Sequence, residues 1–286
     1  MSAAGEVAEW AGGPALVACD LDGTLVDEAG APYPGIAAAL GALGSAGVHI
    51  VLSSGRTVAA TRAGARRLGL AAGYAIAYHG AVLTDVAAGR WLERFDLPAA
   101  VAPGLATALL RAGACVTAYV DDERWEQGGR DDATIGRAPS GSSGAATSRA
   151  AAAGAAPAPR LQGDLGAALE GVAVTRLVVT GAAAGLVADL AARHDGVAVS
   201  DAPGSRLEVS HAAADKGAAL ARLCARLGVS RAGAVACGDG APDAGMLRWA
   251  GLGIAIAEGD AAARAAADLV VPRTELPATL VGLLSR

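Results

Sequence analysis

Two aspartates separated by one residue are the first feature of the chain that could perform chemistry. Asp20 and Asp22 stand in the run DLDGTL (residues 20–25), directly after the apolar run 15–19. Residues two apart leave a strand on the same side, and the glycine behind them permits a tight turn. The pattern predicts two carboxylates at the end of a buried strand. A solvated acidic loop is the alternative interpretation of this motif alone.

Lys216 is the second candidate. It is the only lysine among the 23 basic residues of the chain, and all the others are arginine. A surface lysine usually serves solubility, but here arginine fills that role everywhere else. A lone lysine therefore indicates a position that needs a compact ammonium rather than a planar guanidinium. It also stands at the start of a predicted helix, where anions are favoured.

Two further segments offer groups that suit an anion and a cation. The run SSGR (residues 53–56) follows an apolar run and brings Ser54 and Gly55 to a strand end, although a plain turn would also explain it. The run GDGAPD (residues 238–243) brings Asp239 and Asp243 to another strand end. Carboxylate oxygens are ligands that hard divalent cations accept. Asp243 could instead be an ordinary acid in the first turn of a helix.

These four segments, in this order, resemble the motifs of the haloacid dehalogenase-like superfamily of phosphotransferases. The stretch from residue 208 to residue 220 is similar to its Cof-type branch. The resemblance implies a nucleophile at Asp20 and a general acid and base at Asp22. It implies phosphate binding by the Ser54 hydroxyl, the Gly55 amide and Lys216. It also implies Mg²⁺ held by Asp20, the backbone oxygen of Asp22, and Asp239, with Asp243 acting through a metal-bound water or by holding Lys216.

The chemistry that the resemblance implies is demanding. Enzymes accelerate the hydrolysis of phosphate monoesters by up to about 10²¹-fold, and an aspartyl-phosphate intermediate divides the reaction into two easier steps. A carboxylate that approaches a phosphate dianion needs a divalent cation and a basic side chain nearby. We expect a Mg²⁺-dependent phosphatase whose substrate is a small phosphorylated metabolite, such as a sugar or polyol phosphate.

Two positions depart from the family pattern. Pro242 and His79 each stand where the family usually has asparagine, and the chain contains no asparagine at all. A general drift against asparagine explains both, but so would reduced turnover or a changed substrate. A sugar phosphomutase, a phosphatase of glycosyl-phosphoglycerate or sucrose phosphate, and a non-catalytic protein that binds phosphorylated ligands therefore remain alternatives.

The elements that must position these residues alternate between strand and helix. Short apolar runs at 15–19, 48–52, 74–78, 234–237, 252–257 and 269–271 are typical of buried strands, and helices are predicted over 34–46, 57–68 and 215–227. This order predicts an α/β fold with a Rossmann-like, doubly wound parallel sheet. Ligands bind such sheets at the carboxyl ends of the strands.

The middle of the chain differs in pattern. Hairpin-like strands at 115–120, 176–180, 197–201 and 206–210 accompany helices near 99–112 and 183–193. We expect a discontinuous catalytic core over 12–84 and 211–286, with an inserted α+β cap domain over 85–210. Residues 137–159 are almost all Ala, Gly, Ser and Pro, which predicts a flexible linker within the cap.

Composition limits the partners and the compartment. The net charge is −5 and aromatic residues make up 3%, so the chain offers neither a basic track nor stacking platforms for nucleic acid. It contains no run of 18 strongly apolar residues, and residues 1–10 carry no basic residue, so we expect neither a membrane span nor a secretory leader. Four widely spaced cysteines suggest reduced thiols and a cytoplasmic protein. The oligomeric state stays open.

Overall fold

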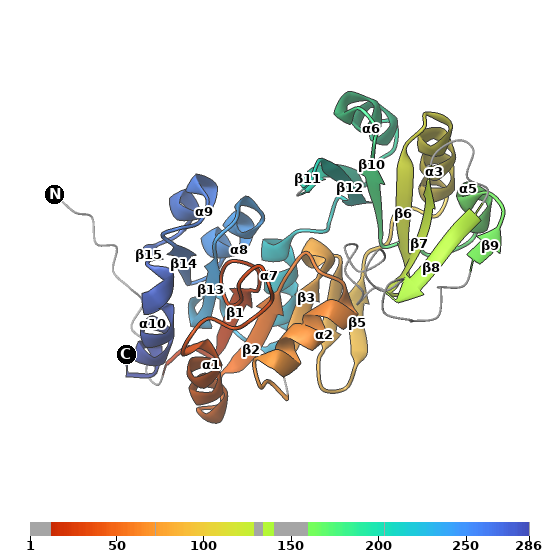
Figure 1. Cartoon of the computed structure of the whole chain (residues 1–286). Helices are drawn as coiled ribbons and strands as arrows, with labels where there is room; N and C mark the ends of the chain where they lie inside the picture. Colours follow the sequence, from red (N-terminus) through yellow and green to blue (C-terminus); the bar gives the residue numbers. More distant parts are fainter. Residues whose placement is uncertain (1–12, 72, 129–133, 140–159, 203, 286) are drawn as a thin grey trace. The chain divides into compact units, whose positions relative to one another are not determined.

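The computed structural model describes residues 13–71, 73–128, 134–139, 160–202 and 204–285 of the 286-residue chain. The chain divides into two compact units: Met1–Glu93 with Ala214–Arg286, called the core unit here, and Arg94–Ala213, called the inserted unit. Figure 1 shows the elements of both units along the sequence. Each unit has its own sheet, so each is described by itself.

The core unit is built on an eight-stranded sheet in the order β15-β14-β13-β1-β2-β3-β4-β5. Its six strands from β15 to β3 are parallel, and β4 is antiparallel to β3. The first and second halves of the parallel part diverge from β1 and β13, as in a doubly wound sheet. The predicted fold class is thereby confirmed. The strands are β1 (Leu16–Asp20), β2 (His49–Ser53), β3 (Tyr74–Ala77), β4 (Val82–Asp85), β5 (Arg90–Arg94), β13 (Ala234–Gly238), β14 (Leu252–Ile256) and β15 (Leu269–Val271).

The core unit continues beyond residue 84, where the sequence placed its first boundary. Strands β4 and β5 extend the sheet, so this unit ends at Glu93 and resumes at Ala214. A tight turn joins the two strands, in which the Asp85 carboxylate accepts a hydrogen bond from Ala88 N at 2.8 Å. The half-exposed pattern of β5 hides it from an analysis that looks for apolar runs.

Six α-helices of the core unit are described: α1 (Ile36–Ser45), α2 (Val58–Arg67), α7 (Lys216–Leu227), α8 (Ala244–Trp249), α9 (Ala261–Ala266) and α10 (Leu276–Gly282). Local caps agree with the predicted ranges 57–68 and 215–227. The Thr57 hydroxyl accepts from Ala60 N at the start of α2, and the Asp215 carboxylate accepts from Ala218 N at 2.7 Å at the start of α7. Gly228 ends α7 with a φ of 69°.

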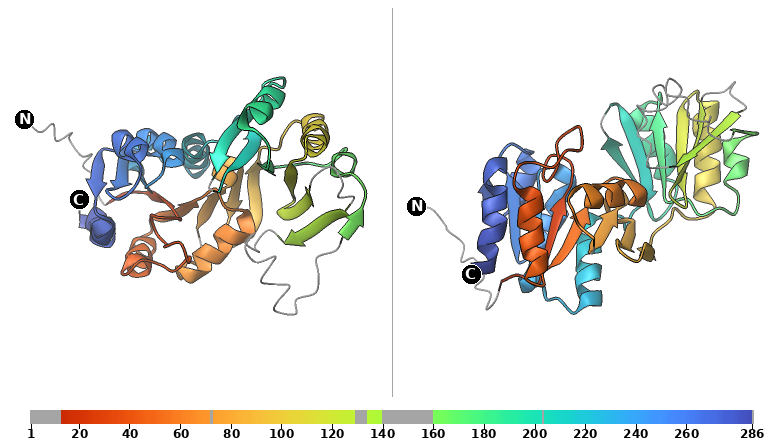
Figure 2. Two further views of the ribbon diagram at one scale, coloured as in Figure 1. Left: turned by 45° about the horizontal axis from the view of Figure 1, so that its top comes forward. Right: turned by 60° about the horizontal axis from the view of Figure 1, so that its bottom comes forward.

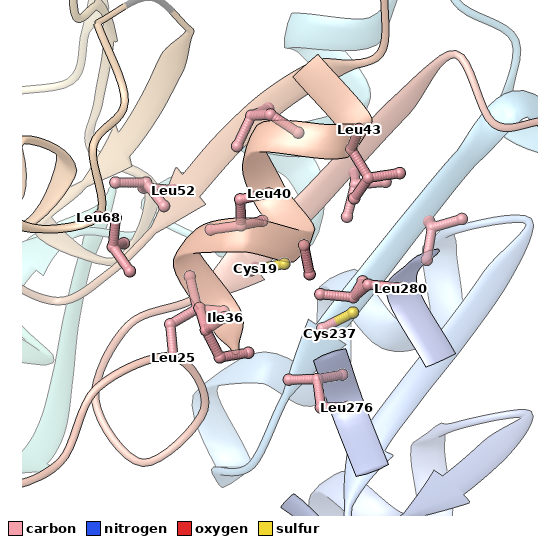
Figure 3. Close-up of a cluster of buried hydrophobic side chains, with 14 of the residues drawn as sticks. Cys19, Leu25, Ile36, Leu40, Leu43, Leu52, Leu68, Cys237, Leu276 and Leu280 are labelled. Carbon is pink, nitrogen blue, oxygen red and sulfur yellow. The ribbon is translucent and has the colours of Figure 1, made fainter. Parts of the chain in front are cut away.

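Both faces of the core sheet are covered. Along β1, Cys19 packs with α1 and α10 on one face, whereas Ala18 packs with α7 and α8 on the other. Figure 3 shows Cys19 and Cys237 among the leucines of the first cluster. Both thiols are free, fully buried and paired in register across β1 and β13, so they serve as small packing groups.

The inserted unit is an α+β layer with a seven-stranded sheet in the order β11-β12-β10-β6-β7-β8-β9. Every pairing that the structure describes in it is antiparallel. Its strands are β6 (Cys115–Val120), β7 (Glu123–Gly128), β8 (Thr134–Pro139), β9 (Arg160–Gln162), β10 (Arg176–Thr180), β11 (Val197–Ala202) and β12 (Arg206–His211). Its described α-helices are α3 (Val101–Arg111), α5 (Leu165–Ala168) and α6 (Ala184–Ala191).

A single apolar cluster joins the helices of the inserted unit to one face of its sheet. Leu109 of α3 and Val187 of α6 belong to this cluster together with Val116 of β6 and Leu177 of β10. Figure 2 gives two further views of these elements. The predicted strands 115–120 and 176–180 are confirmed with the same bounds. Of the predicted linker, residues 137–139 end β8, and residues 140–159 lie outside the described residues.

Among the residues that the structure describes, every helix is too short or too polar to cross a lipid bilayer.

Candidate active site

The predicted site begins at the switch point of the core sheet. Asp20 is the last residue of β1, and Asp239 directly follows β13, its parallel neighbour. The carboxyl ends of these two strands lie at one edge of the sheet, where open α/β folds bind ligands. Only 5% of the surface of Asp20 is exposed, so its carboxylate is removed from bulk water.

Lys216 lies between two of the predicted carboxylates. Its Nζ donates to Asp20 Oδ1 at 2.6 Å and to Asp243 Oδ1 at 2.7 Å. A longer bond of 3.4 Å reaches the carbonyl oxygen of Ser53 at the end of β2. The side chain is buried at the first turn of α7. A compact ammonium with three donors meets this arrangement, whereas a planar guanidinium would not.

Burial and charge act against each other in this cluster. Burial raises the pKa of Asp20, and the charge of Asp243 adds to the rise, although the Lys216 ammonium opposes it. Burial lowers the pKa of Lys216, but the charges of Asp20 and Asp243 outweigh burial, and the pKa is raised above its ordinary value. Lys216 is therefore a fixed positive charge at neutral pH.

Asp239 is held by the turn that follows β1. The Thr24 hydroxyl donates to Asp239 Oδ1 at 2.9 Å. Gly23 has a φ of 85°, and a Cβ at that position would lie 2.2 Å from Asp239 Oδ2. The glycine is therefore required both by its backbone conformation and by the close approach of a carboxylate. Burial raises the pKa of Asp239, and the bond from Thr24 and the charge of Arg273 oppose that rise.

Three carboxylates fit a divalent cation. Asp20, Asp239 and Asp243 each offer an oxygen within 4.8 Å of the oxygens of the other two. Oxygen ligands of this kind suit Mg²⁺, which keeps several waters and takes few carboxylates. Asp243 is the most occupied of the three, because its Oδ2 also accepts from Asp239 N at 3.1 Å and Gly240 N at 2.9 Å. This arrangement suits a residue that orients Lys216 and the strand-end turn.

The Asp22 side chain is paired with an arginine. Arg56 Nε donates to Asp22 Oδ2 at 2.8 Å, and Arg56 Nη2 bonds the second oxygen, Oδ1. Half of the Asp22 side chain is exposed, against a quarter for Arg56. The two parallel bonds fix the plane of the carboxylate. Arg56 belongs to the run 53–56, but the sequence alone did not indicate this pairing.

Ser54 and Gly55 follow β2 at the neighbouring strand end. Ser54 N donates to Ile76 O at 2.8 Å, and Arg56 N donates to Ser54 Oγ at 3.1 Å. Because Asp20 and Ser53 are paired in register, Ser54 lies one residue beyond the level of Asp20. A Cβ on Gly55 would lie 2.2 Å from His79 Nε2, so the imidazole packs directly on this loop.

His79 occupies a backbone position that asparagine would adopt more easily. Tyr78 and His79 have φ angles of 51° and 54°, in the left-handed region, where asparagine, aspartate and histidine are more frequent than other side chains. His79 N donates to Ser54 O at 3.1 Å. The replacement by histidine therefore retains the turn and places a ring against the predicted phosphate loop.

Pro242 lies in a turn that tolerates proline. It lies in the 3₁₀ turn Ala241–Asp243, which leads into α8. The adjacent Ala241 N donates to Asp260 Oδ2 at 3.0 Å, and Asp260 N donates to Asp239 O at 2.6 Å. Asp260 thus ties the segment that carries Asp243 to Asp239, a role that nothing in the sequence indicated.

The structure brings the predicted residues together in three groups. Asp20, Lys216, Asp239 and Asp243 form one connected cluster, Ser54 and Gly55 lie at the adjoining strand end, and Asp22 faces Arg56. Sequence reasoning missed four neighbours. Thr24 and Arg56 could have been found within the motifs, whereas Asp260 and Arg273 lie outside every motif.

The comparison with protein families agrees with this geometry. The sequence model described as haloacid dehalogenase-like hydrolase matches residues 17–138 and 181–276, well over half of the chain. The chain therefore belongs to the haloacid dehalogenase-like hydrolases.

Solved structures show the same fold along nearly the whole chain. A protein from Thermotoga maritima has a TM-score of 0.75 at 20% identity and covers 96% of this chain and 97% of its own. A phosphatase of the haloalkanoate superfamily from Bacteroides thetaiotaomicron gives 0.74 at 18% identity, with 98% of both chains covered. A subclass IIB sugar phosphatase gives 0.71 at 16% identity, covering 94% and 99%. At these identities the likeness establishes the fold.

One curated relative is similar over a short stretch. The phosphoglycolate phosphatase of Pyrobaculum neutrophilum is 49% identical over 73 residues, which make up 26% of this chain and 32% of that protein. The match thus spans about a third of the length of that relative.

Proposed function

We propose that this chain is a Mg²⁺-dependent phosphatase that hydrolyses small phosphorylated metabolites, such as sugar or polyol phosphates, through an aspartyl-phosphate at Asp20. One observation carries the proposal: Lys216 Nζ bonds both Asp20 and Asp243, beside the carboxylate of Asp239. A nucleophile, a fixed positive charge and oxygen ligands for a cation thus come together at one strand end.

In the first step, an oxygen of Asp20 attacks the phosphorus atom. The new bond between that oxygen and phosphorus forms as the bond to the leaving oxygen breaks, and Asp22 gives its proton to the leaving oxygen. Lys216 holds the plane of the Asp20 carboxylate through Oδ1, so the reacting group is oriented before substrate arrives. The ammonium also offsets the repulsion between the carboxylate and the phosphate.

In the second step, water attacks the phosphorus atom of the aspartyl-phosphate. Asp22, now a carboxylate, takes a proton from this water. The bond between phosphorus and Asp20 breaks, inorganic phosphate leaves, and Asp22 is again protonated for the next turnover. The exposure of about half of the Asp22 side chain suits a group that must meet both a leaving alcohol and water.

The phosphate group itself would be bound by the loop after β2. Ser54 Oγ accepts a hydrogen bond from Arg56 N, and its own proton can be donated to a phosphate oxygen. The Gly55 amide and Lys216 would supply further donors. These three residues come from the ends of β2 and the start of α7, which lie at the same edge of the sheet.

A Mg²⁺ ion would be held by Asp20, Asp239 and the backbone oxygen of Asp22, with Asp243 holding Lys216 and the loop. When bound, it supplies positive charge that neutralises the phosphate oxygens as negative charge develops. We also propose that the inserted unit is a cap domain that selects the substrate and excludes water from the reaction.

A second substrate class is favoured by one observation. The 73-residue similarity to a phosphoglycolate phosphatase suggests that a short phosphorylated carboxylic acid should be tested beside the sugar phosphates. The two classes differ in charge, since the leaving group of phosphoglycolate carries a carboxylate.

The test is phosphate release with Mg²⁺ from a panel of sugar phosphates, polyol phosphates and phosphoglycolate. We expect the wild type to release phosphate and Asp20→Asn to lose about 10³-fold or more in kcat/KM. Asp189→Asn, at an exposed position on α6, is the matched control and should retain activity. Equal absence of phosphate release from the wild type and Asp20→Asn would refute the phosphatase, and activity that depends on a sugar bisphosphate and releases no phosphate would favour a phosphomutase.

A further inference from the structure

An arginine from the C-terminal part of the chain hydrogen-bonds the turn that follows β1. Arg273 Nε donates to the carbonyl oxygen of Gly23 at 2.7 Å, across 250 residues of sequence. We propose that Arg273 is a positioning residue, which holds the turn 22–24 in place and so sets the affinity of the site for its divalent cation. The inference rests on the proposed function, because it concerns the cation of that site.

The turn is in direct contact with Asp239, whose carboxylate would bind the cation. Gly23 lies between Asp22, whose backbone oxygen is a proposed ligand, and Thr24, which donates to Asp239 Oδ1 at 2.9 Å. The space beside Gly23 is filled by the Asp239 carboxylate, because a Cβ would lie only 2.2 Å from its Oδ2. A shift of the turn must therefore displace either the Asp22 carbonyl or the Asp239 carboxylate.

Arg273 is itself held by three contacts. The Glu258 carboxylate accepts from Arg273 N at 3.0 and 3.3 Å, which fixes the backbone. The guanidinium lies over the Tyr33 ring, 4.9 Å from its centroid. Tyr33 N in turn donates to Leu25 O at 3.0 Å, just after the turn. The guanidinium of Arg273 therefore packs on the Tyr33 ring, and the Tyr33 backbone is hydrogen-bonded to the same segment that Arg273 contacts. Such a compact set of contacts can hold the Gly23 carbonyl in place.

A positioning role and a purely electrostatic role of Arg273 predict opposite changes in Mg²⁺ affinity when the residue is removed. A guanidinium near a cation site repels the cation, so an arginine that acted only through its charge would weaken binding, and its removal would tighten binding. An arginine that positions the ligands strengthens binding, and its removal weakens binding. The sign of the change therefore separates the two roles.

The experiment measures Mg²⁺ binding by titration calorimetry on the full chain without substrate. We expect the Kd for Mg²⁺ to rise about 10-fold in Arg273→Ala, the lower end of what outer-shell partners of metal ligands contribute. Arg273→Lys retains the charge but loses the guanidinium geometry, and we expect a smaller rise. Tyr33→Leu removes the platform alone and should weaken binding in the same direction.

Arg231→Ala is the matched control. Arg231 also donates to main-chain carbonyls of the core unit, those of Trp249 at 2.6 Å and Arg248 at 3.2 Å, but the structure gives it no bond to the site. We expect wild-type Mg²⁺ affinity in this variant. Thermal unfolding without Mg²⁺ checks that every variant is folded. If Arg273→Ala does not fold, the milder Tyr33→Leu and Arg273→Lys variants decide the question.

Unchanged or tighter Mg²⁺ binding in the folded Arg273 variants would overturn the positioning role. The proposed function would survive that result as long as the wild type binds Mg²⁺ and Asp239→Asn does not. A wild type that fails to bind Mg²⁺ would instead refute both the cation site and the inference built on it.

Discussion

The buried charged side chains of the two units come from differently arranged segments of the chain. In the inserted unit, Arg176 of β10 pairs with Glu208 of β12 at 3.0 Å and lies over the Tyr119 ring of β6, 4.7 Å from its centroid. These residues come from neighbouring strands of one antiparallel sheet. In the core unit, Lys216, Asp20 and Asp243 come from three segments far apart in sequence, and they meet at one strand end.

The balance of charge differs as well. In the inserted unit, Arg176 and the Glu208 carboxylate carry opposite charges, so this pair is neutral in itself. In the core unit, one ammonium faces three carboxylates whose oxygens lie within 4.8 Å of one another. An excess of negative charge that is largely buried is costly unless a cation joins it. The ion pair of the inserted unit thus joins two adjacent strands of one sheet, whereas the unbalanced cluster at the switch point of the core sheet is poised for a ligand.

Removal of the Lys216 ammonium should have the largest effect on activity. In Lys216→Met, Asp20 and Asp243 lose the cation that separates them, so we expect kcat/KM to fall about 10³-fold because a fixed charge in the site is gone. We also expect the free energy of unfolding to fall by about 3 kcal/mol without divalent metal, the cost of leaving buried charges unpaired. Phosphate release and urea unfolding measure the two effects.

The equivalent change in the inserted unit serves as the control for Lys216. Arg176→Met also removes a buried cation, but from a pair that we assign no part in the chemical step. We expect its loss of activity on a small aryl phosphate to be at least about tenfold smaller than that of Lys216→Met, because only Lys216 bonds the proposed nucleophile. Equal losses in the two variants would remove the distinction between the units.

Arg56 gives a smaller effect with a more specific signature. Its two bonds to Asp22 orient the group that we propose as general acid. An alkoxide leaving group needs a proton, whereas 4-nitrophenolate leaves readily without one. Arg56→Ala should therefore lower kcat about 10-fold for an alkyl phosphate and change it less than about threefold for 4-nitrophenyl phosphate.

Two control variants test whether Arg56 acts through Asp22. Arg66→Ala, at an exposed position of the following helix α2, removes a similar charge and should leave both substrates unaffected. Arg56→Lys retains the charge and should restore part of the activity on the alkyl phosphate. A loss of equal size on both substrates would show that Arg56 acts on phosphate binding or on folding rather than through Asp22.

The two units also differ in how far the sequence predicts them. In the core unit, the strands are buried on both faces and appear as short apolar runs, so β1 and β2 are found within one residue of their ends. The caps at Thr57 and Asp215 are local hydrogen bonds, and local chemistry can be recognised from the sequence. Strands β4 and β5 were not predicted. They are short, and β5 is only partly buried, so it does not appear as an apolar run.

In the inserted unit the prediction is less complete. Strands β6 and β10 alternate or are apolar enough to be found, but β7 (ERWEQG) has no clear periodicity and was missed. Its place is decided by pairing with β6, from Cys115 opposite Gly128 to Val120 opposite Glu123. Pairing between strands is a long-range property that a short window of sequence does not contain.

The site shows the same division. Asp20, Lys216, Asp239 and Asp243 were predicted because their residue types and order resemble known motifs, and the structure brings them together. Arg273 was not predicted, since its bond to Gly23 spans 250 residues. The chemistry of a reactive group is visible in its type, but the residues that hold it in place are chosen by the fold.

The smallest effect on activity is expected from a change in the apolar interior of the inserted unit. Leu109 is fully buried in the cluster of that unit, and Leu40 is fully buried in a cluster of the core unit. Replacing either leucine by alanine should cost about 2–5 kcal/mol in the unit that contains it. Because the apolar clusters are separate, we expect Leu109→Ala to lower a calorimetric transition of the inserted unit without lowering the temperature at which hydrolysis of 4-nitrophenyl phosphate is lost.

Leu40→Ala should instead lower the temperature at which that activity is lost, because Leu40 packs with β1, the strand that ends in Asp20. The two variants together therefore test whether the active site depends on the stability of the core unit alone. If Leu109→Ala lowers that temperature as far as Leu40→Ala does, the two units unfold as one cooperative body, and the contrast between a reactive core and a separately stabilised insert fails.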